Sequence, residues 1–143
     1  MESPSSLLLR NDLGELARLE TWVSDWARQY GVAEQTAQHV DLCATETVTN
    51  IMTHGFEQAQ AGRIELRLGC ADHSVVLEIE DDGVAFDPTG SEQSDAPATL
   101  ESTRIGGWGI RIVRRFAEQV SYRRSAGCNC LTLVFRQPPR DAP

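Results

Sequence analysis

The hydrophobic periodicity of the chain changes near its middle, and this change most constrains the fold. Over residues 13–30 and 32–54, apolar side chains recur every three or four positions, which is typical of amphipathic helices. Over residues 63–68 and 75–80, apolar residues instead alternate with other residues, as in half-buried strands. Two helices followed by a strand pair indicate an α+β fold.

The remaining elements complete a two-layer arrangement. We expect a short edge strand over residues 5–9, a third helix that follows residues 106–109, and a final hairpin that pairs 119–124 with 130–136. Residues 69–74 and 126–129 are the expected hairpin turns. The predicted fold class is therefore α+β: a two-layer α/β sandwich whose mixed, mostly antiparallel sheet carries the helices on one face.

The length and composition indicate one domain. The chain has 143 residues, of which 41% are hydrophobic, enough for one packed core. We expect a single domain over residues 1–137 and a flexible tail over 138–143, where proline is frequent. Residues 81–105 lack periodicity and are rich in Gly, Pro, Ser and Thr; a loop of this length favours an active-site lid, with a disordered insertion as the alternative.

The charged residues exclude several function classes. All 13 basic residues are arginines, so the chain has no lysine for a Walker-A loop, for a eukaryotic protein-kinase fold or for Schiff-base chemistry. The formal net charge of −8 argues against direct nucleic-acid binding. Any ATP chemistry would therefore use a different fold.

The N-terminal segment and the cysteines point to the cytoplasm. The first ten residues contain no basic region of a signal peptide, and no apolar stretch approaches the roughly 18 residues of a membrane span. The four cysteines are expected to be free thiols, because Cys128 and Cys130 have no histidine or second cysteine pair nearby for zinc. We expect a cytoplasmic protein without membrane contact.

Three short segments carry candidate chemistry. Glu46, Asn50 and His54 are spaced four residues apart and project along one helical stripe. Alone, such a stripe is usually the polar side of an amphipathic helix. It would also suit a carboxylate that deprotonates a hydroxyl, followed one turn later by an amide oxygen that binds Mg²⁺.

The second and third segments are equally ambiguous when taken singly. Residues 80–83 (Glu-Asp-Asp-Gly) close a predicted strand, where they could form an ordinary acidic turn or present a carboxylate to an exocyclic amine. Residues 106–109 (Gly-Gly-Trp-Gly) lead into the third helix, whose first amide groups could face an anion. A glycine cluster alone is weak evidence for phosphate binding.

In this order, the segments resemble the sequence boxes of the Bergerat-fold (GHKL) ATPases. Residues 45–55 (Thr-Glu-Thr-Val-Thr-Asn-Ile-Met-Thr-His-Gly) resemble the N-box, residues 80–88 the first glycine box, and residues 106–131 the second glycine box. The resemblance covers about residues 10–136, and the chain is most similar to the anti-sigma-factor serine/threonine kinases of bacterial partner-switching systems. One departure is Ala85, at the usual place of a second glycine.

The resemblance implies a role for each matching residue. Glu46 would be the general base, Asn50 the Mg²⁺ ligand, and Asp81 the acceptor of the adenine amino group, with Gly83 beside the ring. Residues at the second glycine box would contact the phosphates: Gly106, Gly107 and Gly109. Residues 87–105 would form the ATP lid, in which Arg104 could reach the γ-phosphate or be an ordinary solvent-exposed arginine.

The resemblance also implies a function. The chain would bind Mg-ATP, sequester a sigma factor, and phosphorylate a STAS-domain anti-anti-sigma protein on serine or threonine, acting as a homodimer. The sequestered protein could also be another regulator, such as a secretion or stress-response component. The alternative is a nucleotide-gated binding module that sequesters its partner without useful phosphotransfer.

Overall fold

The computed structural model describes residues 2–56, 62–71, 73–87 and 108–138. The elements in chain order are β1 (Glu2–Arg10), a 3₁₀ turn η1 (Leu13–Glu15), α1 (Leu16–Gln29), α2 (Glu34–Asn50), a π-helical turn η2 (Ile51–Gly55), β2 (Arg63–Ala71), β3 (Ser74–Asp81), α4 (Trp108–Phe116), β4 (Gln119–Ser125) and β5 (Cys128–Arg136).

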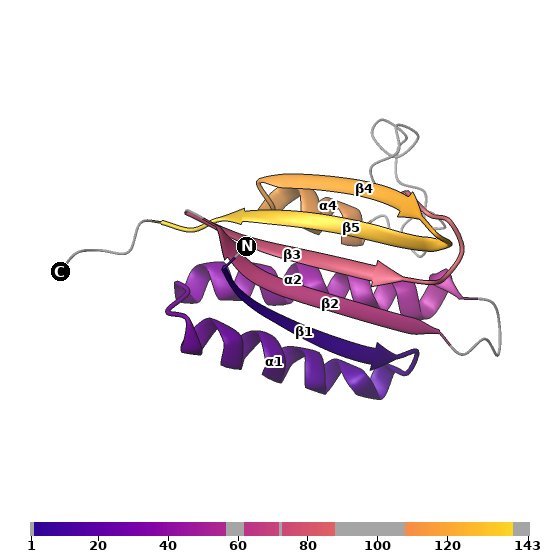
Figure 1. The fold of residues 1–143 in the computed structure, drawn as a ribbon, viewed down its shortest axis with the longest axis horizontal. Helices are drawn as coiled ribbons and strands as arrows, with labels where there is room; N and C mark the ends of the chain where they lie inside the picture. The colour runs from indigo at the N-terminus through magenta and orange to yellow at the C-terminus, as the bar shows by residue number, and fades with distance from the viewer. Residues whose placement is uncertain (1, 57–61, 72, 88–107, 139–143) are drawn as a thin grey trace.

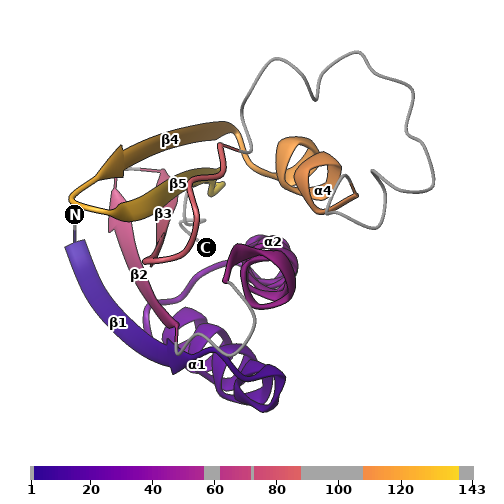
Figure 2. The same cartoon turned by 90° about the vertical axis from the view of Figure 1, so that its right-hand side faces the viewer.

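The strands form one five-stranded sheet in the order β1-β2-β3-β5-β4. Every neighbouring pair is antiparallel. The helices α1, α2 and α4 lie on one face of this sheet (Figures 1 and 2). The predicted two-layer α+β fold is confirmed, although the described strands include no parallel pair. The strand expected over residues 5–9 lies within the edge strand β1.

Side-chain alternation in the central strands builds the core. In β2 and β3 every second residue faces the helices and is almost fully buried, and these residues are Ile64, Leu66, Leu68, Val75, Leu77 and Ile79. The opposite face of the same strands is charged: Arg67 there lies within 4 Å of Glu65, Glu78 and Glu80. One face therefore packs against helices while the other remains polar, as the sequence predicts.

The ends of the two long helical segments have distinct features. Asp12 caps the first helical segment by accepting a hydrogen bond from the Gly14 N–H at 2.9 Å. The second helix is not uniform, because α2 ends at Asn50 and the chain continues as a π-helical turn to Gly55. A π-turn widens the helix locally, and such turns are frequent at functional sites.

The hairpin turns are tighter than predicted. Ala126 and Gly127 both have positive φ (53° and 78°), and Ser125 pairs directly with Cys128. Two central residues of this kind match the right-handed twist of the flanking strands. The predicted turn over 126–129 is therefore too long, and Asn129 belongs to strand β5. The first hairpin is also closed more tightly, since β2 extends to Ala71 and β3 begins at Ser74.

In the described part of the chain, no helix combines the length and the apolar composition needed to cross a membrane.

The centre of the core gives a stability prediction. Leu77 is fully buried on β3, between Leu68 of β2 and Leu133 of β5. We expect Leu77→Ala to lower the free energy of unfolding by about 2–5 kcal/mol, because it removes buried methyl groups and leaves a cavity. Urea unfolding would measure it. Val76→Ala, one residue away on the opposite face, is the control, and an equal loss for both variants would contradict this account.

Candidate functional site

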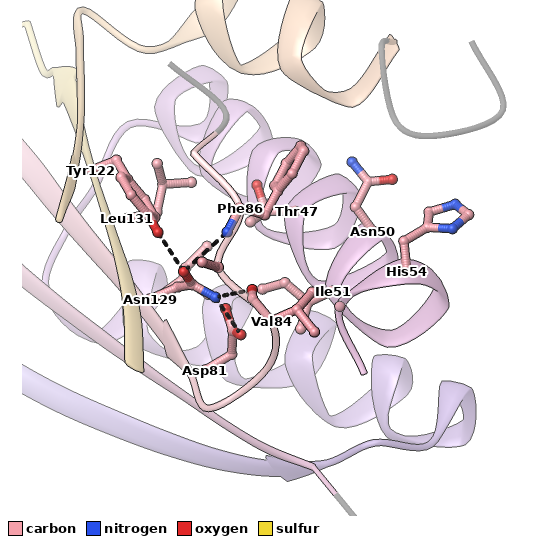
Figure 3. Close-up of a pocket in the computed structure, with 13 residues that line it drawn as sticks. Thr47, Asn50, Ile51, His54, Asp81, Val84, Phe86, Tyr122, Asn129 and Leu131 are labelled. Atoms are coloured by element: carbon pink, nitrogen blue, oxygen red, sulfur yellow. Dashed lines mark hydrogen bonds between the residues drawn. The ribbon is translucent and has the colours of Figure 1, made fainter. Parts of the chain in front are cut away.

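A cavity of about 170 Å³ opens between the C-terminal end of the second helix and the adjoining ends of β3 and β5. Figure 3 shows its lining side chains, which come from four parts of the chain. The lining residues are Thr47, Asn50, Ile51, His54, Gly55, Ile79, Asp81, Val84, Ala85, Phe86, Tyr122, Asn129 and Leu131. Most are apolar, and the few polar groups among them are the ones that could orient a ligand.

Asp81 is the buried carboxylate of this cavity. It closes β3 with 6% of its surface exposed. Its Oδ1 accepts hydrogen bonds from the Gly83 N–H at 2.9 Å and from the Asn129 Nδ2 at 3.0 Å. Within the described residues, no hydrogen bond reaches Oδ2. One carboxylate oxygen is thus occupied by the protein while the other stays available as an acceptor.

Opposing effects act on the ionisation of this carboxyl group. Burial removes water and raises the pKa of Asp81 above its usual range, and the nearby Asp82 acts in the same direction. The hydrogen bonds from Asn129 and Gly83, together with the positive charge of Arg124, lower the pKa. Burial is the larger effect, so the ionised form depends on these neighbouring donors.

Asn129 is the main site residue that the sequence prediction missed. Its Nδ2 donates to Asp81 and to the Val84 carbonyl oxygen at 2.8 Å, and Tyr122 donates to its Oδ1 (Figure 3). Its Oδ1 also accepts from the Phe86 N–H at 3.3 Å and from Arg124 Nη1 at 3.1 Å. The Ala-Gly turn was the available signal, because a two-residue turn places residue 129 on the same strand face as the buried residue 131.

The loop after Asp81 is attached directly to the end of the second helix. The Val84 N–H donates to the Gly55 carbonyl oxygen at 2.8 Å. A Cβ atom on Gly83 would lie 2.2 Å from that oxygen and 3.0 Å from Asp81 Oδ1. Gly83 is therefore required by the approach of two backbone segments, a reason independent of any ring beside it.

Of the candidate residues predicted on the second helix, Asn50 and His54 line the cavity and Glu46 does not. Asn50 and His54 line the cavity together with Thr47 and Ile51. Glu46 is half-buried and is not among the lining residues. Burial raises the pKa of the Cys43 thiol to about 12, and the charge of Glu46 contributes in the same direction. The structure thus brings Asn50 and Asp81 to one cavity and leaves Glu46 beside it.

Of the other predicted site residues, only Gly109 lies within the described residues. Gly109 is the second residue of α4. Arg104, Gly106 and Gly107 lie outside the described residues, as do residues 88–105 of the predicted lid. The contacts predicted for them stay predictions.

The side chains that line the cavity are compatible with a Mg²⁺ ion that is also coordinated by a bound ligand. They contain no group of three His, Cys, Asp or Glu side chains that could hold a metal ion. The side chain of Asn50, which lines the cavity, offers one amide oxygen. Mg²⁺ commonly takes only one or two protein ligands and completes its coordination with phosphates and water, so this donor set is compatible with it.

The contact at Gly83 can be tested without a ligand. We expect Gly83→Ala to lower the free energy of unfolding by about 1–3 kcal/mol, because the new methyl group forces the loop away from the Gly55 carbonyl oxygen. Thermal or urea unfolding would measure it. Gly14→Ala is the control, since its Cβ would meet nothing closer than 3.4 Å. Equal stability of Gly83→Ala and the unchanged protein would contradict the predicted steric conflict.

The chain is similar in sequence to known kinases and anti-sigma factors. The serine/threonine-protein kinase BtrW of Bordetella bronchiseptica is 37% identical over 98 residues, which cover 68% of this chain and 69% of BtrW. The anti-sigma F factor of Bacillus licheniformis is 29% identical over 82 residues, covering 57% of this chain and 56% of that protein. The similarity to a serine/threonine-protein kinase confirms the predicted enzyme class, an ATP-dependent serine/threonine kinase.

A solved structure shows the same fold. The RsbU and RsbW domains of Rv1364c from Mycobacterium tuberculosis align with a TM-score of 0.69 and 17% sequence identity. The alignment covers 98% of this chain and 34% of that one, so the chain spans about a third of the solved protein. Residues 9–135 match the family described as histidine kinase-like ATPase domain. The chain belongs to this GHKL-type ATPase family, as its three sequence boxes predict.

Proposed function

We propose that the chain is an anti-sigma factor and serine/threonine-protein kinase. It binds Mg-ATP, sequesters a sigma factor or similar regulator, and phosphorylates a STAS-type antagonist on serine or threonine. The observation that carries this proposal is that Asn50 of the N-box and Asp81 of the first glycine box line the same cavity. The names of the relatives support the serine/threonine kinase activity and the sigma-factor client.

The cavity suits an adenine base. Ile51, Ile79 and Leu131 provide apolar walls for a planar ring, and the free Oδ2 of Asp81 can accept a hydrogen bond from the exocyclic amine. Because the ionised carboxylate has no donor of its own, it favours an amino group over a carbonyl group at that position.

The phosphates would extend from this base site toward Asn50 and the start of α4. The side-chain oxygen of Asn50 would hold Mg²⁺, which neutralises phosphate charge when bound. The backbone around Gly106, Gly107 and Gly109 would donate N–H groups to phosphate oxygens at a helix N-terminus. Arg104 would add a positive charge at the γ-phosphate.

Glu46 would act as the general base, one helical turn before Asn50. It takes the proton of the substrate hydroxyl as that oxygen bonds to the γ-phosphorus and the bond to ADP breaks. Most of the rate acceleration in such a transfer comes from positioning and charge neutralisation.

Phosphorylation would then switch the partners. A phosphoryl group adds about −1.5 to −2 charges to the antagonist at pH 7, which can disrupt a docked complex. The released kinase is then free to sequester its client. We place this cycle in the cytoplasm, as the N-terminal segment and the cysteines predict, and the family resemblance leads us to expect a homodimer.

One observation favours the alternative of a nucleotide-gated binding module. Glu46 lies beside the cavity and does not line it, so nucleotide binding in the cavity needs no contact with the proposed base. In this alternative, Mg-ATP gates partner binding without useful phosphotransfer.

The role of Glu46 separates the two functions. We expect Glu46→Ala to reduce phosphotransfer by about 10²- to 10⁴-fold, because the general base is lost, while leaving ATP bound. The measurement uses γ-labelled ATP and Mg²⁺ in a source-cell lysate, followed by detection of acid-stable phosphate on one small protein. Glu34→Ala, at the exposed first turn of the same helix, is the control. Failure of the unchanged protein to label anything while it binds Mg-ATP would favour the binding module.

Asp81 should affect nucleotide binding and stability in opposite directions. We expect Asp81→Asn to weaken ADP binding about 10- to 100-fold, because an amide group replaces the acceptor oxygen. The same change should stabilise the fold at pH 7: the pKa of Asp81 is raised by burial, so its ionised form lowers stability as pH rises through that pKa. Calorimetry and urea unfolding measure the two effects. The neighbouring exposed Asp82→Asn is the control, and unchanged ADP affinity in Asp81→Asn would refute the assigned base contact.

A further inference from the structure

Asn129 makes more hydrogen bonds than any other described side chain around the cavity. Its two Nδ2 hydrogens face two acceptors, Asp81 Oδ1 at 3.0 Å and the Val84 carbonyl oxygen at 2.8 Å. Its Oδ1 faces the Phe86 N–H and the Arg124 guanidinium, both of which can only donate. The orientation of the amide is therefore fixed, because a flipped amide would oppose donors to donors and acceptors to acceptors.

This amide connects the two parts of the base site. One of its hydrogen bonds holds the buried carboxylate, and two others, to the Val84 carbonyl oxygen and from the Phe86 N–H, hold the loop that follows it (Figure 3). Arg124 reinforces the same loop through the Gly83 carbonyl oxygen at 3.1 Å. The side chain of Asn129 is itself buried, with 6% of the residue exposed, so water does not readily replace these bonds.

We propose that Asn129 is a positioning residue for base recognition: its amide keeps Asp81 an ionised acceptor with Oδ2 free, and fixes residues 83–86 around it. The inference rests on the proposed binding of an adenine nucleotide in this cavity. Asn129 acts through Asp81, so its effect depends on having a donor at Nδ2.

The variant Asn129→Asp isolates that donor. It keeps the shape of the side chain and the Oδ1 acceptor for Phe86 and Arg124, while an oxygen replaces Nδ2. At high pH this oxygen would face Asp81 Oδ1 and the Val84 carbonyl oxygen with no hydrogen between them. At lower pH the carboxyl pair takes up one proton, which restores a donor between residues 129 and 81.

The ratio of the dissociation constants of the variant and of the unchanged protein should therefore depend on pH. We expect Asn129→Asp to bind ADP about 10- to 100-fold more weakly than the unchanged protein at pH 8, and this deficit to shrink steadily toward pH 5. The other ionisable groups around the cavity are His54 from η2, Asp82 from the loop, and Tyr122 and Arg124 from β4. They are common to both proteins, as is the ionisation of ADP, so the ratio of the two dissociation constants removes their contributions.

The experiment is calorimetric titration of ADP with Mg²⁺ into each full-length protein at several pH values, with folding checked by circular dichroism. Asn11→Asp is the matched control, because it makes the same chemical change away from the cavity and should bind like the unchanged protein at every pH. A Kd ratio that is close to one, or constant with pH, would overturn the role of Asn129 and leave the proposed function intact. Failure of the unchanged protein to bind ADP would overturn both.

A second measurement decides the matter if Asn129→Asp does not fold. In the unchanged protein, the side-chain amide resonances of Asn129 should shift as Asp81 titrates, and Asp81→Asn should abolish that shift. Amide resonances that do not respond to pH, or that respond identically in Asp81→Asn, would overturn the proposal.

Discussion

The site depends on keeping a carboxylate charged in a buried position. Moving an ionised group out of water is costly unless donors replace the lost hydration. Asp81 receives two such donors on one oxygen, from its own turn and from β5, and a nearby arginine on β4 adds a favourable charge. Three separate parts of the chain thus meet at one side chain. This requirement explains why β5 contributes Asn129 to the site, although none of the predicted site residues lies on that strand.

A second constraint joins the helical layer to the sheet. The second helix widens into a π-turn at Ile51–Gly55, and the last carbonyl of that turn accepts the Val84 N–H. Because this carbonyl oxygen lies only 2.2 Å from where a Cβ on Gly83 would be, the helix end and the loop after β3 can meet in this way only at a glycine. The N-box and the first glycine box, far apart in the sequence, are therefore coupled by a backbone contact.

Much of this arrangement could be predicted from the sequence, because it depends on local patterns. The alternation in β2 and β3 identified the buried face, and the spacing of Leu16, Leu19 and Val23 identified the first helix. The order of the three segments identified the family. Asn129 could not be recognised in the same way, because its role comes from strand pairing: Asp81 and Asn129 are neighbours across β3 and β5. The π-turn was also missed, since a change from four-residue to five-residue hydrogen bonding leaves the apolar spacing nearly unchanged over one turn.

The proposed nucleotide site has a base end and a phosphate end that are built differently. At the base end, the apolar walls, the buried carboxylate and its amide are already connected by hydrogen bonds, so little ordering is needed when a base enters. At the phosphate end, the described residues that line the cavity include no arginine, and Arg124 is engaged with Gly83 and Asn129. Since the chain has no lysine, charge neutralisation at the phosphates would depend on backbone N–H groups, a cation at Asn50, and an arginine such as Arg104. The base would then be recognised by the hydrogen-bonded residues at the ends of β3 and β5. The phosphate charge would be neutralised separately, near the start of α4.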